Sequence, residues 1–300
     1  AERFHEIVQH IGEIDLYEMT SLFSFSLSRS LYTFPFYGNT NCKFVTRIFP
    51  FFLFSGIGIG GVMMNFHAQD PSLYPLHLLS SWGRRSMPGK EIYSTNLEWD
   101  SRGAVLFRGM GRSYGDSSLP ANPSNRVINT CFADRIRSFD RTTGRIRAEA
   151  GLTLLEINRL FLRKQWFSPV TPGTQYVTLG GMVAADVHGK NHHRAGCFGD
   201  HVHQLRLRTP NGRILECSEN RDTELFYATI GGMGLTGHIL EIEFSLEKIP
   251  TPWIWQETTR IEGIDEFIQS LKIAAREWPF TVGWIDCLTQ DRNMGRGILM

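Results

Sequence analysis

The sequence has little cysteine and almost no net charge, and both shortages argue against whole classes of protein. Its 300 residues contain five scattered cysteines and no C-x-x-C pair. A disulfide framework is therefore a poor fit, and a reducing compartment fits better. The formal net charge is +1, which provides no basic field for nucleic acid, so we expect no nucleic-acid partner.

The two common nucleotide-phosphate motifs are also missing. The dinucleotide fingerprint G-x-G-x-x-G fails in RGMGRSYGD, because Tyr114 stands where the third glycine belongs. The Walker loop fails because Asn191 follows Gly189 and Lys190, and Ala184 takes the leading glycine position. Strands and helices do not alternate regularly, so a doubly wound Rossmann sheet is a poor fit as well.

Long hydrophobic runs are scarce. Residues 48–64 carry no charge, but they only reach the lower limit of the ~17–25 apolar residues that a spanning helix needs, and Pro50 and several glycines interrupt them. Two interpretations stay open. The run is a membrane anchor or signal-like segment, or it belongs to an extension upstream of a natural start at Met63 or Met64. Residues 1–75 are therefore an unassigned extension.

From about residue 80 the pattern is orderly and predicts a mixture of hairpins and helices, an α+β fold. Short strands are expected at 103–109 and 126–129, and hairpins around the turns at 142–144 and 210–212. The stretch 238–246 alternates between two faces. We expect Leu240, Ile242, Phe244 and Leu246 to face the core, and Ile239, Glu241, Glu243 and Ser245 to face away.

Helix starts are marked by capping residues. Thr153 with Glu156 three positions later forms a capping box. Thr178 opens a helix of small residues, and Asp222 is expected to cap a short third helix. The segment Ile249–Trp253 contains two prolines and is expected to be a domain boundary. An amphipathic helix at 264–278 and a strand at 281–288 would then begin a second domain.

Three glycine-rich loops follow short elements, at 109–115, 172–181 and 231–237. Glycine allows a positive φ and a close approach of a ligand to the backbone. Successive amide groups can then surround an anion. One such loop is most simply an ordinary turn, but three in one domain indicate a phosphate-bearing ligand.

The segment DVHGKNHH invites a metal interpretation, since His188 and His192 are four residues apart. However, Gly189 interrupts the helix between them, and no carboxylate or cysteine completes a ligand set nearby, so we expect no metal. His188 and Lys190 fit better beside an anionic or redox ligand. His201 and His203, which alternate along a strand, are most simply surface histidines.

Four stretches closely resemble the FAD-binding oxidoreductases of the vanillyl-alcohol-oxidase or p-cresol-methylhydroxylase (PCMH-type) superfamily. They are SSWGR, RGMGRSYGD, PGTQYVTLGGMVAADVHGKNHHRAGCFGDHV and ATIGGMGLTG. The resemblance runs from about Ser80 to the last residue. It implies a two-subdomain FAD-binding domain at 80–249 and, at 253–300, the beginning of an α+β substrate (cap) domain that is incomplete here.

The resemblance also implies which residues meet the cofactor. The first loop would cradle the FAD pyrophosphate, the second loop and the HGKN segment would line the flavin and its phosphates, and Ile239 would meet the adenine side through its backbone. The full set is Phe107, Arg108, Gly109, Met110, Gly111, Arg112, Ser113, Tyr114, Gly115, Asp116, Ser117, Gly173, Thr178, Leu179, Gly180, Gly181, His188, Gly189, Lys190, Asn191 and Ile239. Some relatives attach FAD covalently through a histidine at the position of Arg112. Arginine cannot form that bond, so non-covalent FAD is expected.

The implied reaction is oxidation of a secondary hydroxyl of a sugar, with hydride transfer to flavin N5. The resemblance favours the 2′-hydroxyl of a polyprenylphosphoryl-β-D-ribose, with Tyr114, His188 and Lys190 as catalytic candidates. It also implies a reductase partner that completes an epimerisation, and a cytoplasmic or membrane-surface location. A second hypothesis is an aldonolactone or sugar-alcohol oxidase. A third is an FAD-binding fragment without turnover, because family residues of the substrate site would follow Met300.

Overall fold

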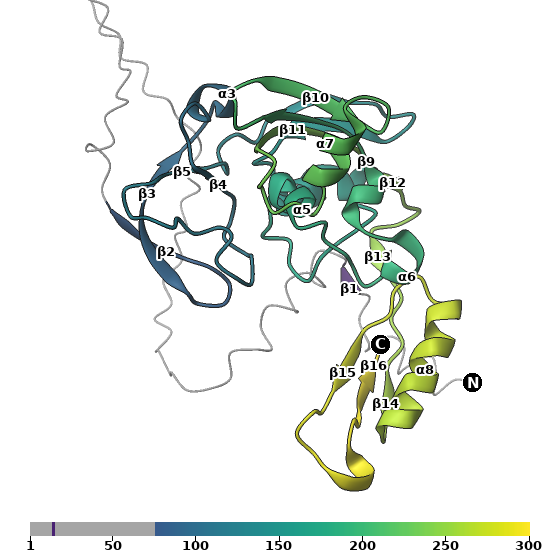
Figure 1. The fold of residues 1–300 in the computed structure, drawn as a ribbon. Helices are drawn as coiled ribbons and strands as arrows, with labels where there is room; N and C mark the ends of the chain where they lie inside the picture. Colours follow the sequence, from purple (N-terminus) through teal and green to yellow (C-terminus); the bar gives the residue numbers. More distant parts are fainter. Residues whose placement is uncertain (1–13, 16–75) are drawn as a thin grey trace, which may run out of the picture.

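The structure of the chain is a computed structural model, which describes residues 14–15 and 76–300 (Figure 1). The apolar run at 48–64 lies outside the described residues. Within the described part, no helix has the length and the apolar character needed to cross a membrane.

A four-stranded sheet carries the first glycine loop at one edge. Its order is β2-β3-β5-β4. The bounds are β2 His77–Ser80, β3 Ser86–Tyr93, β4 Leu106–Arg108 and β5 Arg126–Asn129. β3, β5 and β4 are parallel, whereas β2 is antiparallel to β3. Parallel strands need a crossover, and helix α3 (Leu97–Asp100) lies in the one between β3 and β4. The carboxyl ends of β3, β4 and β5 therefore share the edge where the loop begins.

A five-stranded antiparallel sheet, in the order β10-β9-β11-β7-β6, forms the second and larger layer (Figure 1). The bounds are β6 Ile136–Phe139, β7 Arg145–Glu149, β9 Val202–Arg208, β10 Ile214–Ser218 and β11 His238–Ser245. Both predicted hairpins are confirmed, as β6 pairs with β7 and β9 pairs with β10. Mixed strands and helices make the domain α+β, as predicted.

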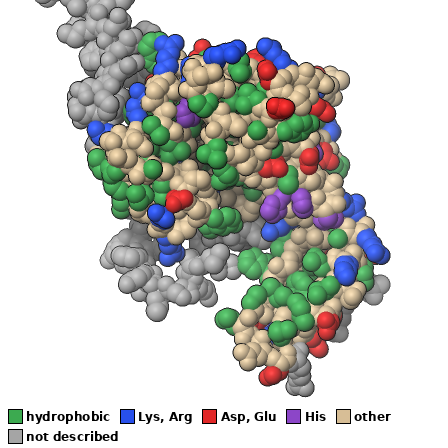
Figure 2. All heavy atoms as spheres, viewed as in Figure 1, with side chains coloured by type: hydrophobic (Ala, Val, Ile, Leu, Met, Phe, Trp, Pro, Cys, Tyr) green, Lys and Arg blue, Asp and Glu red, His purple; other side chains and the backbone are tan. Residues whose placement is uncertain are grey.

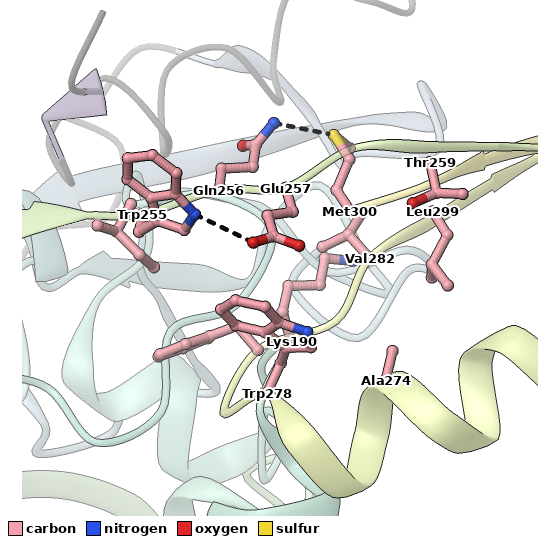
Figure 3. Close-up of a pocket in the computed structure, with 12 residues that line it drawn as sticks. Lys190, Trp255, Gln256, Glu257, Thr259, Ala274, Trp278, Val282, Leu299 and Met300 are labelled. Atoms are coloured by element: carbon pink, nitrogen blue, oxygen red, sulfur yellow. Dashed lines mark hydrogen bonds between the residues drawn. The ribbon is translucent and has the colours of Figure 1, made fainter. Parts of the chain in front are cut away.

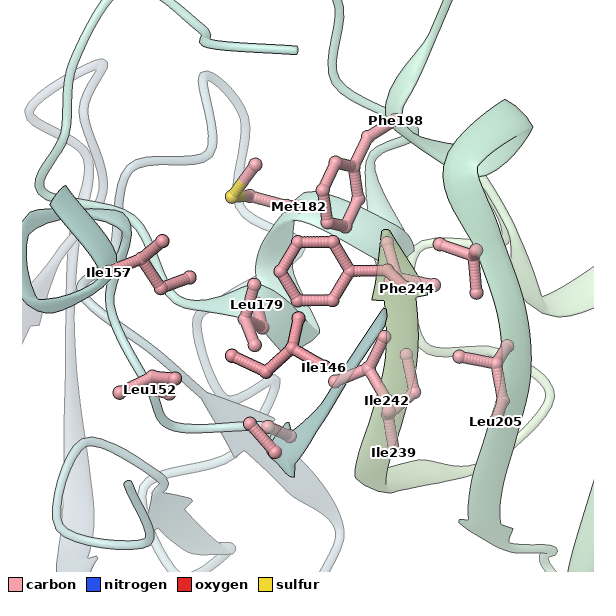
Figure 4. Packing of buried hydrophobic residues seen from close by; sticks show 14 of the residues in the cluster. Ile146, Leu152, Ile157, Leu179, Met182, Phe198, Leu205, Ile239, Ile242 and Phe244 are labelled. Atoms are coloured by element: carbon pink, nitrogen blue, oxygen red, sulfur yellow. The ribbon is translucent and has the colours of Figure 1, made fainter. Parts of the chain in front are cut away.

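Helix α5 (Leu179–Ala184) packs on the inner face of this sheet (Figure 4). Its Leu179 and Met182 are fully buried in the same cluster as Ile242 and Phe244 of β11. The predicted core face of β11 is thus confirmed. The prediction that Ile239 faces away from the core is wrong, because Ile239 is buried in that cluster. A register shift between Ile239 and Glu241 breaks the strict alternation there.

Arginines of neighbouring segments form ion pairs with Glu149 of β7 and Glu241 of β11. Arg135 and Arg137 donate to Glu149 Oε1 at 2.7 and 2.9 Å. Arg147 Nε lies 2.8 Å from Glu241 Oε2. Buried carboxylates need such partners, because a lone buried charge is costly. The predicted outward position of Glu241 is therefore only partly met, since Glu241 is buried and its charge is paired with arginines of neighbouring strands.

Caps begin the helices much as predicted. In α4 (Leu154–Phe161) the Thr153 hydroxyl accepts from the Glu156 amide, and the Glu156 carboxylate accepts from the Thr153 amide, so the capping box is confirmed. Thr178 caps α5 through the Gly181 amide. The prediction for Asp222 is wrong in detail. Asp222 precedes α7 (Thr223–Thr229) with φ 49°, and its side chain makes no capping hydrogen bond.

A smaller unit follows residue 258. It packs helix α8 (Ile264–Glu277) on a three-stranded sheet, in the order β14-β16-β15. The strands are β14 Thr259–Ile261, β15 Gly283–Ile285 and β16 Gly297–Leu299. Phe267 of α8 is buried with Ile261 and Leu299 in a cluster of its own. The predicted helix and strand are confirmed, while the proposed boundary at 249–253 stays a prediction.

The remaining short elements connect these parts. They are β1 Ile14–Asp15, β8 Trp166–Phe167, β12 Glu247–Lys248, β13 Trp253–Ile254, helix α6 His192–Ala195 and the 3₁₀ turns η2 Leu162–Lys164, η3 Phe198–His201 and η4 Asp291–Asn293. β1 pairs with β13, and β8 pairs with β12.

Candidate functional site

The first glycine loop, residues 109–117, leaves β4 with its amide groups available. Among the hydrogen bonds between described residues, the backbone amides of residues 109–117 donate none. Gly111 has φ 66° and is buried, whereas Tyr114 is 83% exposed. Consecutive backbone amides without acceptors in the protein can donate to phosphate oxygens. The loop is thus suited to an anionic group at the edge of the first sheet.

Arg108 braces this loop from inside. Its Nη1 donates to the Ser118 carbonyl at 3.0 Å, its Nη2 to the Ser80 carbonyl at 2.7 Å, and its Nε lies 3.3 Å from a Glu91 carboxylate oxygen. A side chain at Gly111 would collide with the Arg108 guanidinium. The buried Arg108 head therefore supports the loop, and its donors are already used by the protein.

The second loop meets the first at the start of α5. A side chain at Gly109 would collide with the Thr178 side chain, so the two loops touch there. The first amides of α5 are already engaged: Leu179 donates to the Leu152 carbonyl and Gly180 to the Ala150 carbonyl, both at 2.8 Å. These helix amides are not available to an anion. The loop at 109–117 is accordingly the main set of open donors.

The third loop closes around the other end of α5. The amides of Gly231 and Met233 donate to the carbonyls of Val183 and Ala184, at 2.9 and 2.8 Å. The three glycine-rich loops, which are separate in sequence, therefore meet at the two ends of one six-residue helix. Of the predicted residues in the second loop, Gly173 is exposed at the surface.

Past the third loop, His238 stacks on Phe107 of β4. The ring centroids are 4.2 Å apart and the planes are 17° apart. Phe107 and the neighbouring Ile239, both predicted cofactor residues, are thus brought together with the first loop. His238 Nε2 lies 3.1 Å from the Ala104 carbonyl.

Acid is expected to destabilise the protein through His238. Burial lowers the pKa of His238 below 6.5, although the hydrogen bond to Ala104 opposes this. Below about pH 6.5 His238 binds a proton more readily in the unfolded chain than in the folded chain. The free energy of unfolding therefore falls as pH falls. A His238→Gln variant should lose part of this slope in urea unfolding between about pH 6.5 and pH 5. An exposed-site control, His77→Gln, should retain the full slope, and equal slopes in all three proteins would contradict the prediction.

The HGKN segment presents two exposed side chains and buries a third. His188 and Lys190 are exposed, whereas Asn191 is buried and donates from Nδ2 to the Pro169 carbonyl at 2.7 Å. The Asn191 Oδ1 and the Thr171 hydroxyl are buried, and neither has a hydrogen-bond partner in the described part. A side chain at Gly189 would press on both residues. The segment is therefore polar on its inner side and open on its outer side.

The two histidines considered as metal ligands, His188 and His192, lie close together. The rings of His188 and His192 are 5.5 Å apart at their centroids, and His193 Nε2 lies 3.0 Å from the Trp278 carbonyl. Within residues 14–15 and 76–300, no group of three or more His, Cys, Asp or Glu side chains could hold a metal ion. Figure 2 shows histidines gathered at the surface where the α8 unit meets the larger body.

The outer side of Lys190 opens into a pocket that the sequence did not reveal. Lys190, Trp255, Glu257, Trp278 and Met300 all line it (Figure 3). The Thr281 amide donates to the Lys190 carbonyl at 3.0 Å and fixes the segment against the α8 unit. In the sequence, the one sign of an aromatic wall is the pair of tryptophans in WIW, residues 253–255, just past the two prolines. Tyr114 comes from the first loop and is not among the residues that line this pocket.

The sequence of the chain is similar to those of known FAD-binding proteins. Residues 98–218 match the model of the FAD binding domain family. Decaprenylphosphoryl-beta-D-ribose oxidase of Mycolicibacterium smegmatis is 33% identical over 235 residues, which cover 74% of this chain and 50% of that protein. Cytokinin dehydrogenase 1 of Arabidopsis thaliana is 35% identical over 190 residues, 62% of this chain and 32% of its own. The putative D-arabinono-1,4-lactone oxidase of Neurospora crassa is 25% identical over 144 residues, 48% and 25% of the two chains.

The matched region contains the first two glycine loops and the HGKN segment, and the chain spans about half the length of the M. smegmatis relative. The residues present fit FAD. Nine consecutive open amides offer donors for a pyrophosphate. The buried Ser81 hydroxyl, which has no partner among described residues, belongs to the segment whose Trp82 amide donates to the Ser113 carbonyl of this loop. With its α+β fold, its match to the FAD binding domain family and these relatives, the chain contains an FAD-binding domain of the PCMH type.

Proposed function

We propose that this chain is the FAD-binding part of an oxidoreductase that converts a secondary hydroxyl of a sugar to a ketone. The observation that carries the proposal is the loop at 109–117, whose amides find no acceptor among described residues while its base is braced by Arg108. Because so many backbone donors in one loop lack acceptors within the protein, the loop is suited to bind a phosphorylated ligand. The family match makes that ligand FAD.

Within this proposal, residues 107–117 hold the pyrophosphate. Gly173, Thr178–Gly181 and His188–Asn191 line the flavin, and the backbone of Ile239 meets the adenine. Arg112 is exposed on the loop and cannot form the covalent link that a histidine forms, so FAD is held without a covalent bond. These assignments are supported by the contacts that gather the three loops around α5.

When bound, FAD supplies the acceptor for the hydride that leaves the hydroxyl-bearing carbon. The protein's own task is to orient the sugar and to move the hydroxyl proton. His188 and Lys190 are exposed beside the pocket and are the candidates for these roles, with Lys190 also placing positive charge next to developing negative charge. Tyr114, from the first glycine loop, is the third candidate.

The finer choice of substrate rests on the M. smegmatis relative, named a decaprenylphosphoryl-ribose oxidase. By that likeness the substrate is the 2′-hydroxyl of a polyprenylphosphoryl-β-D-ribose at a membrane surface, and a reductase partner completes the epimerisation. A second candidate, an aldonolactone oxidase, is favoured by the N. crassa relative. An FAD-binding fragment without turnover is the third, because the chain spans half of its relative.

Purification should separate these candidates. We expect the protein to carry the visible absorption band of flavin, and acid precipitation should leave the flavin in solution. Anaerobic addition of farnesylphosphoryl-β-D-ribose should bleach the band, whereas bleaching by D-arabinono-1,4-lactone alone would favour the second candidate. Flavin that neither compound bleaches indicates a binding fragment. A colourless protein that does not take up FAD would overturn the proposal altogether.

A further inference from the structure

The pocket beside Lys190 has walls from two distant segments of the chain. One wall is Lys190 of the HGKN segment, and the other includes Ile254–Glu257, Thr259, Trp278 and the end of β16. The pocket holds about 110 Å³ and is open to solvent on one side. In Figure 3 the side chains of Lys190, Glu257 and Trp278 point into the same space. A pocket of this kind, partly aromatic with a few convergent polar groups, is typical of small-molecule sites.

Its polar groups are of balanced charge. Among the described residues that line it, Lys190 is the one cation and Glu257 the one anion. Glu257 is exposed, and its Oε1 accepts a hydrogen bond from Trp255 Nε1 at 3.4 Å. This contact leaves further lone pairs of the carboxylate available, since an ionised carboxylate can accept about four hydrogen bonds.

The two indoles add a flat apolar surface. Trp255 is 65% exposed, and Trp278 lies on the same pocket. Aromatic rings with an adjacent hydrogen-bond acceptor suit a ligand that has one apolar face and several hydroxyl groups at its rim. An anionic group is a poor occupant of the wall formed by Trp255 and Glu257, because the Glu257 carboxylate would repel it at short range and Lys190 lies on the facing wall.

We infer that Glu257 and Trp255 are specificity-determining residues, which admit a neutral polyhydroxylated ring to this pocket and keep a substrate phosphate outside it. Glu257 accepts hydrogen bonds from the ring hydroxyls while Trp255 covers the C–H face. Lys190, on the facing wall, contacts the hydroxyl that reacts. The inference rests on the proposed function for its setting, since it assigns the sugar side of the same site.

Binding to the FAD-loaded protein tests this without turnover. The neutral probe is D-ribono-1,4-lactone and the anionic probe is D-ribose 5-phosphate, each followed by the flavin difference spectrum and by indole fluorescence. Glu257→Gln should weaken binding of the lactone on the order of tenfold, because a charge-assisted hydrogen bond becomes a neutral one. The same variant should strengthen binding of the phosphate severalfold, because the repulsion is removed.

The matched control is Glu262→Gln, an exposed glutamate that does not line the pocket. It should bind both probes as the unchanged protein does, and all three proteins should contain equal FAD. If FAD is bound but Glu257→Gln leaves the preference between the two probes unchanged, the inference fails and the proposed function stands. Failure of the FAD-loaded protein to bind the lactone overturns the inference as well. Absence of FAD from every variant is instead a failure of the proposed function.

Discussion

Replacing Gly111 with alanine is expected to weaken FAD binding by about tenfold or more. Gly111 has φ 66°, a conformation that costs a residue with a side chain about 1–2 kcal/mol, and its Cβ would collide with the Arg108 guanidinium. The loop must move to relieve both, and this displaces the amides that are proposed to hold the pyrophosphate. Titrating the apoprotein with FAD and following flavin fluorescence measures the change.

The same loop contains its own control. Gly115 has no positive φ, and a Cβ there would meet no atom within 4 Å. Gly115→Ala should therefore bind FAD within about twofold of the unchanged protein. Equal dissociation constants for the Gly111 and Gly115 variants would show that the geometry at Gly111 does not matter for binding.

Replacing Arg108 with methionine is expected to lower the free energy of unfolding by about 3 kcal/mol. The change removes the donors to the carbonyls of Ser80 and Ser118, and it leaves the Glu91 carboxylate, whose side chain is 10% exposed, without its cation. Urea unfolding of the apoprotein measures the loss. FAD binding should fall as well, because the loop is no longer held at both ends.

A second substitution distinguishes the effect of the unpaired Glu91 carboxylate from the other effects of losing Arg108. Glu91→Gln in the Arg108→Met background should recover part of the lost stability, since it removes the uncompensated carboxylate. Arg159→Met on the exposed side of α4 should change the free energy of unfolding by no more than about 0.5 kcal/mol. If the double variant is less stable than Arg108→Met alone, the buried pair is not the cause.

Local signals in the sequence predicted most of the elements. The capping box at Thr153 depends only on residues three apart, and the hairpins depend on short turns, so both could be read directly. The buried face of β11 follows from its alternation. These features are fixed within a few residues of chain.

Features that depend on distant partners were missed. The inward direction of Arg108 is set by Ser80 and Glu91, which come from other strands, and a one-residue irregularity in the pairing buries Ile239. The engaged amides at the start of α5 likewise depend on carbonyls of residues 150 and 152. The Lys190 pocket joins segments more than sixty residues apart, and no local pattern indicates such a meeting.

The joint between the larger body and the α8 unit relies on main-chain hydrogen-bonding groups of residues 276–281. Arg194 donates to the Arg276 carbonyl, His193 lies at the Trp278 carbonyl, and Lys190 itself is held by the Thr281 amide. Every amino acid except proline offers the same amide, and all offer the same carbonyl. Side chains along 276–281 can therefore drift through evolution, or be randomised in a library, while the lysine keeps its place. Substitutions along 276–281 are therefore expected to change sugar selectivity while the position of Lys190 is retained.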